Sequence, residues 1–295
     1  MLILLLTFFI SLLLSSNNIS LCCGIVVGSK ILRKNLAIIL TYISFSLGLI
    51  VEGFKLFPIK NLTVEGLREE EIVVVMMAVI VSFLIAGFIK VPLSLSKGII
   101  GAILGYSLAK GYKINLSYTF NILLFWFLLP LVAFFLSIFF LNLDRKLSYG
   151  RVWIKVSTLK PLLIISSFLI GYTIGSNTLS ILLALSDSLY TILIGSFIGS
   201  FFFSGRILRF IGEEIFGLRY VSAFSSQTLS AILVELATQI HIPVAVSEIV
   251  TSSMMGTVFS YKVRILNIKK IFKIFLGWFL LPVIPFLLSL LIGFF

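Results

Sequence analysis

Two short polar stretches interrupt very apolar segments of this sequence, and both contain the same order of residue types. The first is KVPLSLSKGIIG at 90–101, and the second is HIPVAVSEIVTS at 241–252. Each has a proline, then a serine, then a charged residue, which is Lys97 in the first stretch and Glu248 in the second. Ionisable residues inside apolar segments are costly, and they mark binding sites and proton relays. Lys97 could therefore hold an anion, and Glu248 could take up and release a proton.

The two prolines predict tight turns. Proline removes a backbone donor and suits the first turn of a new helix. We therefore expect helical hairpins over 84–108 and 236–258, with Pro92 and Pro243 at their tips. A turn at membrane depth must be buried in protein or line a wet cavity, so the tips need not cross the bilayer fully. The helix that begins after each proline points its free amides at the tip, which favours an anion there.

Asparagine-centred motifs form a second matched pair. SSNNIS at 15–20 aligns with GSNTLS at 175–180. We predict that the amides, hydroxyls and ammonium group of all four motifs converge on one polar cavity that binds an oxyanion. The predicted binding residues are Asn17, Asn18, Ser94, Ser96, Lys97, Ser176, Asn177 and Ser247.

Structural roles for these polar residues remain open. Lys97 and Glu248 could form a fixed ion pair that only fastens the hairpins together. Serine side chains in membrane helices also bond back to their own backbone, so any single serine could be structural. Glu235, within a presumed span, is a further candidate for a proton relay.

Composition defines the class of protein that must position these residues. The chain has 295 residues, of which 60% are hydrophobic and 12% charged, and its mean hydropathy is +1.20. Soluble domains carry about 25% charged residues, so we expect an all-α polytopic membrane protein. The net charge of +12 fits basic cytoplasmic loops rather than a nucleic-acid partner. Cys22 and Cys23 are adjacent and would make a poor disulfide, and we expect no metal site or cofactor.

About ten apolar segments have roughly the ~20 residues that cross a bilayer. They lie at 1–28, 35–54, 72–90, 92–110, 119–141, 160–178, 179–203, 221–241, 243–260 and 273–295. Basic loops follow near 29–35, 144–160, 205–219 and 261–273, whereas 55–71 is acidic. Because cytoplasmic loops collect Lys and Arg, ten spans predict a plasma-membrane protein with its N-terminus outside.

A repeated WFLLP motif divides the chain. FWFLLP in the first half and GWFLLP in the second align Trp126 with Trp278, which we expect to pack or to anchor at the membrane interface. The division gives a first membrane repeat at 1–141, a basic cytoplasmic linker at 142–159 and a second membrane repeat at 160–295. Five spans in each repeat would start the second repeat on the opposite side of the membrane. This is the inverted-topology plan of many secondary transporters.

These motifs resemble the signatures of the inorganic phosphate transporter (PiT) family, which comprises sodium- or proton-coupled phosphate symporters. The family has a GANDVAN-type signature and a later PVSTTH-type signature in each half. Here the first type corresponds to SSNNISLCCGIVVGSK and GSNTLSILLA, and the later type to VPLSLSKGIIGAILG and IPVAVSEIVTSSMMG. The basic loop and helix at 205–236 are also similar to those of the family.

The resemblance implies that the Asp, Asn, Ser and Thr positions of these signatures hold phosphate and its coupling cation. Asn18 and Thr178 stand where the family has Asp, and Lys97 and Glu248 stand where it has His. Loss of both Asp residues removes anionic oxygens that a hard cation would use. We therefore expect proton rather than sodium coupling, through Glu248 and Thr178.

The resemblance implies a proton-coupled symporter of inorganic phosphate that works by alternating access. Sulfate or another oxyanion is an alternative, because the site is rich in donors and poor in carboxylates. A member that no longer transports could instead serve as a membrane scaffold or sensor. An enzyme is not expected, since no soluble catalytic domain fits beside ten spans. The expected partners are an oxyanion and the lipid bilayer, and a homodimer is compatible with the chain.

Overall fold

The computed structural model shows a helical protein. The residues that it describes are 1–28, 31–63, 66–89, 94–147, 152–203, 220–260, 277–279 and 282–294. Within these ranges no strand forms beyond an isolated bridge between Thr63 and Ile114. The predicted all-α class is therefore confirmed.

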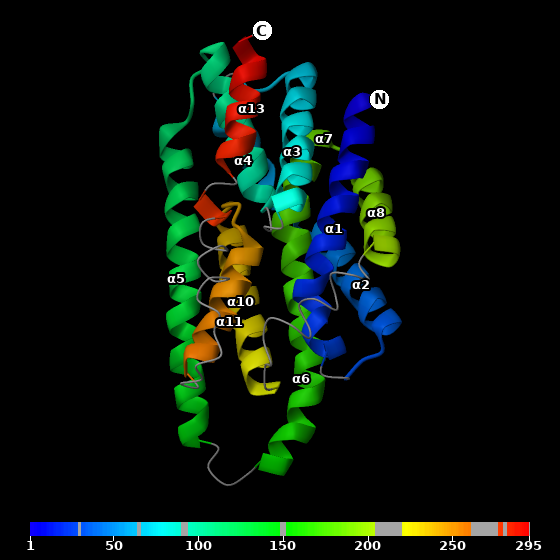
Figure 1. Cartoon of the computed structure of the whole chain (residues 1–295), viewed down its shortest axis with the longest axis vertical. Coiled ribbons are helices and arrows are strands. Elements are labelled where there is room, and N and C mark those ends of the chain that lie inside the picture. The colour runs from blue at the N-terminus through cyan, green and yellow to red at the C-terminus, as the bar shows by residue number, and fades with distance from the viewer. Residues whose placement is uncertain are drawn as a thin grey trace.

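The helices follow one another as Figure 1 shows. Those of the first half are α1 (Leu2–Gly28), α2 (Lys34–Glu52), the 3-10 helix η1 (Gly53–Leu62), α3 (Glu69–Ile89), α4 (Leu95–Lys110) and α5 (Leu116–Leu147). Those of the second half are α6 (Val152–Thr173), the π-helix η2 (Ile174–Leu179), α7 (Ser180–Ser186), α8 (Leu189–Ile198), the π-helix η3 (Gly199–Phe203), α10 (Tyr220–Gln239), α11 (Val246–Ser260) and α13 (Val283–Phe294).

The described part contains 5 helical segments that are long and apolar enough to cross a membrane. They are Leu2–Gly24, Lys34–Leu62, Leu116–Leu143, Thr158–Ser186 and Gly277–Phe294. Four of them overlap one predicted apolar segment each, whereas Thr158–Ser186 runs across the predicted boundary between 160–178 and 179–203. The chain is thus a multi-pass membrane protein, whereas the count of ten spans, the repeat boundaries and the side of the N-terminus remain predictions.

Two helical hairpins occupy opposite ends of the molecule. In Figure 1, α3 and α4 lie in the upper half, whereas α10 and α11 lie in the lower half. The 16 residues of α4 and the 15 of α11 span about 24 and 22 Å, which is less than a hydrocarbon core of ~30 Å. The preceding arms, α3 and α10, have 21 and 20 residues, so the expectation that the tips do not cross fully stays a prediction. Pro243 lies in the turn between α10 and α11, whereas Pro92 falls outside the described residues.

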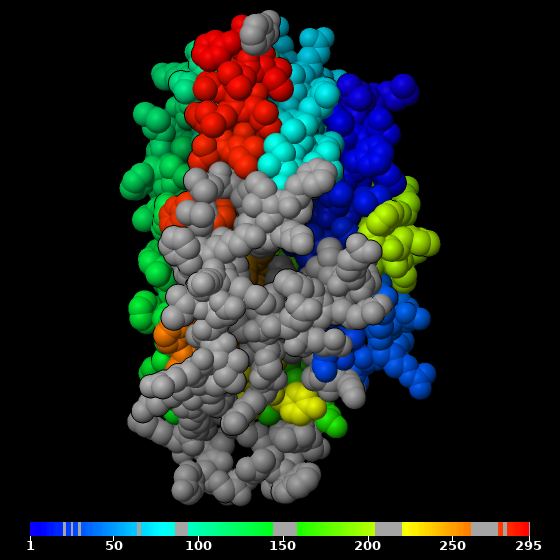
Figure 2. Space-filling model, viewed as in Figure 1, coloured from blue at the N-terminus to red at the C-terminus, as the bar shows by residue number. Residues whose placement is uncertain are grey.

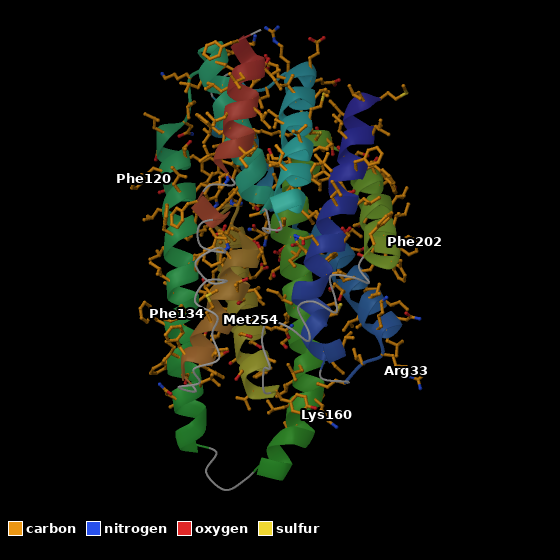
Figure 3. All side chains as sticks on the ribbon, viewed as in Figure 1. Arg33, Phe120, Phe134, Lys160, Phe202 and Met254 are labelled. Carbon is orange, nitrogen blue, oxygen red and sulfur yellow. The ribbon has the colours of Figure 1, made fainter. Side chains whose placement is uncertain are left out.

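The outer surface carries large apolar side chains. Phe120 on α5 and Phe202 on η3 point away from the bundle in Figure 3 and are 65% and 73% exposed. Lipid accommodates such a surface, whereas water does not. Figure 2 shows α13, α3 and α1 side by side across the upper part of one face. Arg33 and Lys160 lie toward the lower end in Figure 3, beside two of the loops predicted to be cytoplasmic.

The crossing of α2 with α6 and η2 brings backbones into direct contact. A Cβ atom at Gly48 would overlap the Tyr172 carbonyl oxygen, and one at Gly175 would overlap the Phe45 carbonyl oxygen. Small residues permit this close approach between membrane helices. The crossing places the end of α2 beside the second asparagine motif, which forms η2.

We predict that Gly48→Ala lowers stability by about 1–3 kcal/mol, because its Cβ meets a backbone atom that cannot rotate away. The matched control is Gly53→Ala, where the nearest atom is Leu183 Cδ2 of a flexible side chain at 3.0 Å. The measurement is the apparent melting temperature of each purified variant in detergent. Equal melting of the two variants would show that the crossing is not tight.

Candidate functional site

The start of α4, in the first hairpin, meets the turn of the second hairpin inside the bundle. Ser96, in the first turn of α4, donates from Oγ to the Val244 carbonyl oxygen at 2.9 Å, and both residues are buried. Ser94 is the N-cap residue of α4, and its side chain makes no capping hydrogen bond. The first hairpin therefore binds the turn of the second directly.

Lys97 and Glu248 form a buried ion pair at this junction. The distance from Lys97 Nζ to Glu248 Oε2 is 2.7 Å, and the two residues are 7% and 3% exposed. The same ammonium group donates to the Trp278 carbonyl oxygen at 3.3 Å. It also lies 5.3 Å from the centroid of the Trp126 ring, where a cation–π attraction adds to its stabilisation. The expected contact between the two charged residues is confirmed.

Trp126 also holds the turn of the second hairpin. Its Nε1 donates to the Pro243 carbonyl oxygen at 3.0 Å. The sequence predicted only packing or interface anchoring for Trp126 and Trp278, yet both contact Lys97. The alignment of the two tryptophans between the halves of the chain was the feature of the sequence that could have indicated this role.

Asn177 holds the same turn from η2. Its Nδ2 donates to the Thr238 hydroxyl at 2.9 Å and to the Ile242 carbonyl oxygen at 3.1 Å. Its Oδ1 accepts from the Val244 amide at 2.9 Å. The residue is fully buried, and π-helical insertions such as η2 are frequent at functional sites. In this conformation Asn177 positions the turn of the second hairpin.

The other predicted residues of the second half have separate surroundings. Ser176 Oγ donates to Glu235 Oε2 at 3.4 Å. The hydroxyl of Thr178 is buried and has no hydrogen-bond partner within the described part of the chain. Ser247 is half-buried in the first turn of α11.

The first asparagine motif lies in α1. Asn18 is buried and Asn17 is half-buried, and α1 contacts both α6 and α11. Helix α1 therefore packs beside α6, the helix that leads into η2 and the second asparagine motif. The predicted residues that the structure brings together around the turn of the second hairpin are Ser96, Lys97, Asn177 and Glu248.

Gln227 is a buried polar residue that the motifs did not single out for the site. Its Nε2 donates to the Cys22 carbonyl oxygen at 2.8 Å. Its Oε1 accepts from Ser166 at 2.9 Å and from Ser167 at 3.4 Å. Gln227 thus joins α10 to α1 and α6 close to the first asparagine motif. An amide side chain in the middle of an apolar segment was the signal that could have found it.

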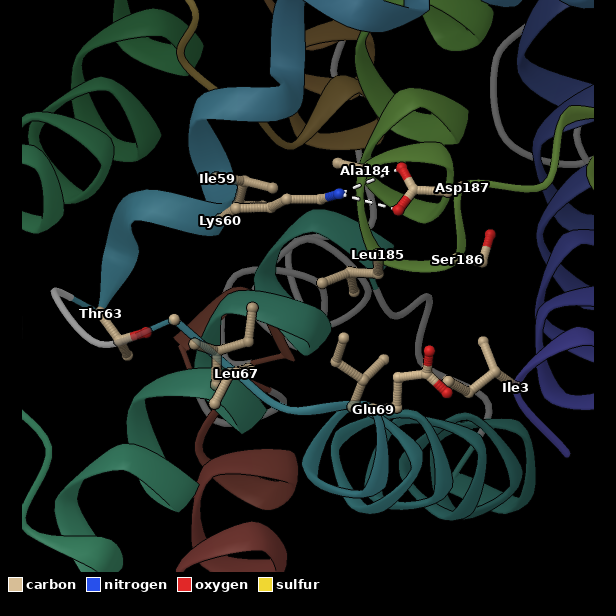
Figure 4. Close-up of a pocket in the computed structure, with 13 residues that line it drawn as sticks. Ile3, Ile59, Lys60, Thr63, Leu67, Glu69, Ala184, Leu185, Ser186 and Asp187 are labelled. Atoms are coloured by element: carbon tan, nitrogen blue, oxygen red, sulfur yellow. Dashed lines mark hydrogen bonds and ion pairs between the residues drawn. The ribbon is translucent and has the colours of Figure 1, made fainter.

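A separate pocket opens at the ends of α3 and α4 that lie away from the hairpin tips. Its volume is about 390 Å³, and Figure 4 shows it between η1, α7 and the start of α3. Lys60 and Asp187 form an ion pair on its wall, with Nζ 3.0 Å from Oδ2. None of the residues predicted for the site lines it.

The fold and the site together define a class of protein. Two short hairpins meet at a buried ion pair within membrane-length helices, and such interrupted helices form the sites of secondary transporters. The family model described as "Phosphate transporter family" matches residues 15–196 and 156–289. The chain therefore belongs to the phosphate transporter family.

Individual proteins agree with this assignment. A protein of Methanocaldococcus jannaschii, named as a candidate phosphate permease, is 24% identical over 98% of this chain and 95% of its own length. A solved structure described as "The sodium-dependent phosphate transporter" has the same fold, with a TM-score of 0.88 and 16% identity. The match covers 99% of this chain and 97% of that one.

We predict that Asn177→Ala loosens the turn of the second hairpin, because two hydrogen bonds to the turn and one to the end of α10 are lost. Hydrogen exchange at the Val244 amide should accelerate by at least tenfold, since each bond contributes about 0.5–1.5 kcal/mol. Asn115→Ala is the matched control, because the Asn115 side chain accepts from the Tyr118 amide at the start of α5. Unchanged exchange at Val244 in the Asn177 variant would contradict the positioning role.

Proposed function

We propose that this chain is a secondary transporter of inorganic phosphate that carries protons with the anion by alternating access. Membership of the phosphate transporter family supports the substrate. The observation that carries the proposed mechanism is the buried contact between Lys97 and Glu248 at the junction of the hairpins. One member of this pair is suited to an anion, and the other is suited to a proton.

Lys97 supplies the charge for the anion. In the empty site its ammonium group is paired with ionised Glu248, which offsets part of the cost of burying both charges. An arriving oxyanion competes with Glu248 for Lys97. The amides at the start of α4 and α11 and the hydroxyls of Ser94 and Ser247 add donors at the same tips, and Ser96 would join them by releasing the Val244 carbonyl oxygen.

Glu248 supplies the proton coupling. When the oxyanion takes Lys97, the Glu248 carboxylate loses its partner inside a site where burial disfavours the charged form. Glu248 then takes up a proton, so the anion and the proton bind together. The mechanism needs no carboxylate at Asn18 or Thr178, the positions where the family has Asp.

Alternating access would follow from two inverted repeats, at 1–141 and 160–295, that move against each other around the hairpin tips. The opposite placement of the two hairpins in Figure 1 supports this arrangement. We place the protein in the plasma membrane with its N-terminus outside, because the basic loops then face the cytoplasm.

Uptake into liposomes tests the substrate and the coupling ion. Purified protein is reconstituted and supplied with labelled phosphate or sulfate, with an inward proton gradient or an inward sodium gradient imposed separately. We expect phosphate to accumulate with the proton gradient. Accumulation driven by sodium alone, the dependence for which the structurally similar transporter is named, would refute proton coupling. Accumulation of sulfate instead of phosphate would refute the substrate.

We predict that Glu248→Gln still exchanges phosphate across the membrane but no longer concentrates it, because the amide imitates the protonated carboxyl group permanently. Lys97→Ala should lower the affinity for phosphate by at least tenfold, as measured by isothermal titration calorimetry. The control pair is Lys60→Ala and Asp187→Asn, which removes an exposed ion pair of similar length. Proton-driven accumulation at the wild-type rate in Glu248→Gln would mean that the buried pair is only a structural clasp.

A further inference from the structure

A second group of ionisable side chains lies where α2, η1, α6 and the end of α10 meet. Its members linked by hydrogen bonds are Glu52, Lys55, Glu235, Gln239 and His241, and Tyr172 lies beside Glu52. Tyr172 is in the middle of the candidate span Thr158–Ser186, and Glu52 belongs to the candidate span Lys34–Leu62. The group therefore lies at membrane depth. Ionisable residues there are costly and point to a functional site.

Two carboxyl groups of this cluster lie close together. Gln239 Nε2 is 3.3 Å from Glu52 Oε2 and 2.5 Å from Glu235 Oε1, so one amide group donates to both carboxyl groups. A single proton held between two carboxyl groups lets one donate to the other, which two ionised carboxylates cannot do. Two like charges this close do not both ionise readily.

The remaining charges of the cluster agree with one shared proton. Lys55 Nζ lies 3.3 Å from Glu52 Oε1 and 2.6 Å from Gln239 Oε1. One ammonium group neutralises one carboxylate, so the pair with its proton and Lys55 together carry no net charge. That balance suits a site at membrane depth, where an uncompensated charge costs several kcal/mol.

Further groups complete the surroundings. Tyr172 of α6 lies close enough to Glu52 to interact with it electrostatically. His241 Nδ1 lies 2.7 Å from the Lys55 carbonyl oxygen, and the His241 carbonyl oxygen accepts from the Tyr118 hydroxyl of α5. These contacts hold the end of α10 and the following turn on η1.

We propose that Glu52 and Glu235 form a second proton-binding site, which holds one shared proton while the second hairpin is docked on η1. Loss of the proton would leave two carboxylates facing one ammonium group, and their repulsion would push α10 away from α2 and η1. The site is linked to the hairpin junction, because Ser176 donates to Glu235 and the next residue, Asn177, holds the hairpin turn. Protonation would thus control how firmly the turn is held, and its consequence for phosphate uptake rests on the proposed function.

Infrared spectroscopy of purified protein detects the shared proton directly. At neutral pH the wild type should show a band from a protonated carboxyl group that disappears in Glu52→Gln and in Glu235→Gln, because the remaining acid then ionises beside an amide donor. Glu71→Gln is the matched control, since that buried carboxylate accepts from the Tyr112 hydroxyl and the Arg68 amide. The control should lose an ionised carboxylate band only. A protonated band that persists in both pair variants would overturn the proposal.

A titration of the wild type keeps the test valid if a variant does not fold. The protonated band should fade as the pH rises, and hydrogen exchange in the 240–245 turn should accelerate over the same pH range. Exchange that does not follow the band would refute the link to the hairpin. Liposomes separate this proposal from the proposed function. If wild-type protein shows the band but transports no phosphate, the proposed function is contradicted and the proton site is supported. If it transports phosphate without showing the band, the proton site is contradicted and the proposed function is supported.

Discussion

The burial of one lysine and one glutamate between two hairpin tips is the constraint on which the rest of the structure depends. Removing charges from water costs several kcal/mol for each ion, and neither charge could remain buried without the other. The pair at 2.7 Å, the Trp278 carbonyl oxygen and the Trp126 ring together compensate Lys97. Both hairpins must therefore stop inside the protein and stay in register. The surrounding helices hold the tips in the positions that this contact requires.

The two halves of the junction are chemically different although their sequences align. The first hairpin contributes a cation and the second a carboxylate, so one half is suited to the anion and the other to the proton. The asparagine motifs differ too, since the first lies in the regular helix α1 and the second in the π-helix η2. Under the proposed function, this difference would give each half a distinct task.

Much of this arrangement could be predicted from the sequence. Long apolar segments, prolines and isolated charges can be accommodated in a membrane in only a few arrangements. The second hairpin, expected over 236–258, followed from those constraints, and so did the first hairpin, whose second helix is α4. The contact of Lys97 with Glu248 followed from them as well. The hydrogen bonds of Asn177 and Trp126 to the turn could not, since they depend on how closely helices cross. The proximity of Glu52 to Glu235 was also hidden, because the residues are far apart in sequence and no repeat relates them.

The most direct test is a cryo-electron microscopy structure of the protein in nanodiscs at saturating phosphate. The account predicts tetrahedral density at the junction of the hairpin tips, in contact with Lys97 Nζ, and a Glu248 carboxyl group that has left the lysine. Phosphate density at another place in the bundle, with the contact between Lys97 and Glu248 still intact, would contradict it.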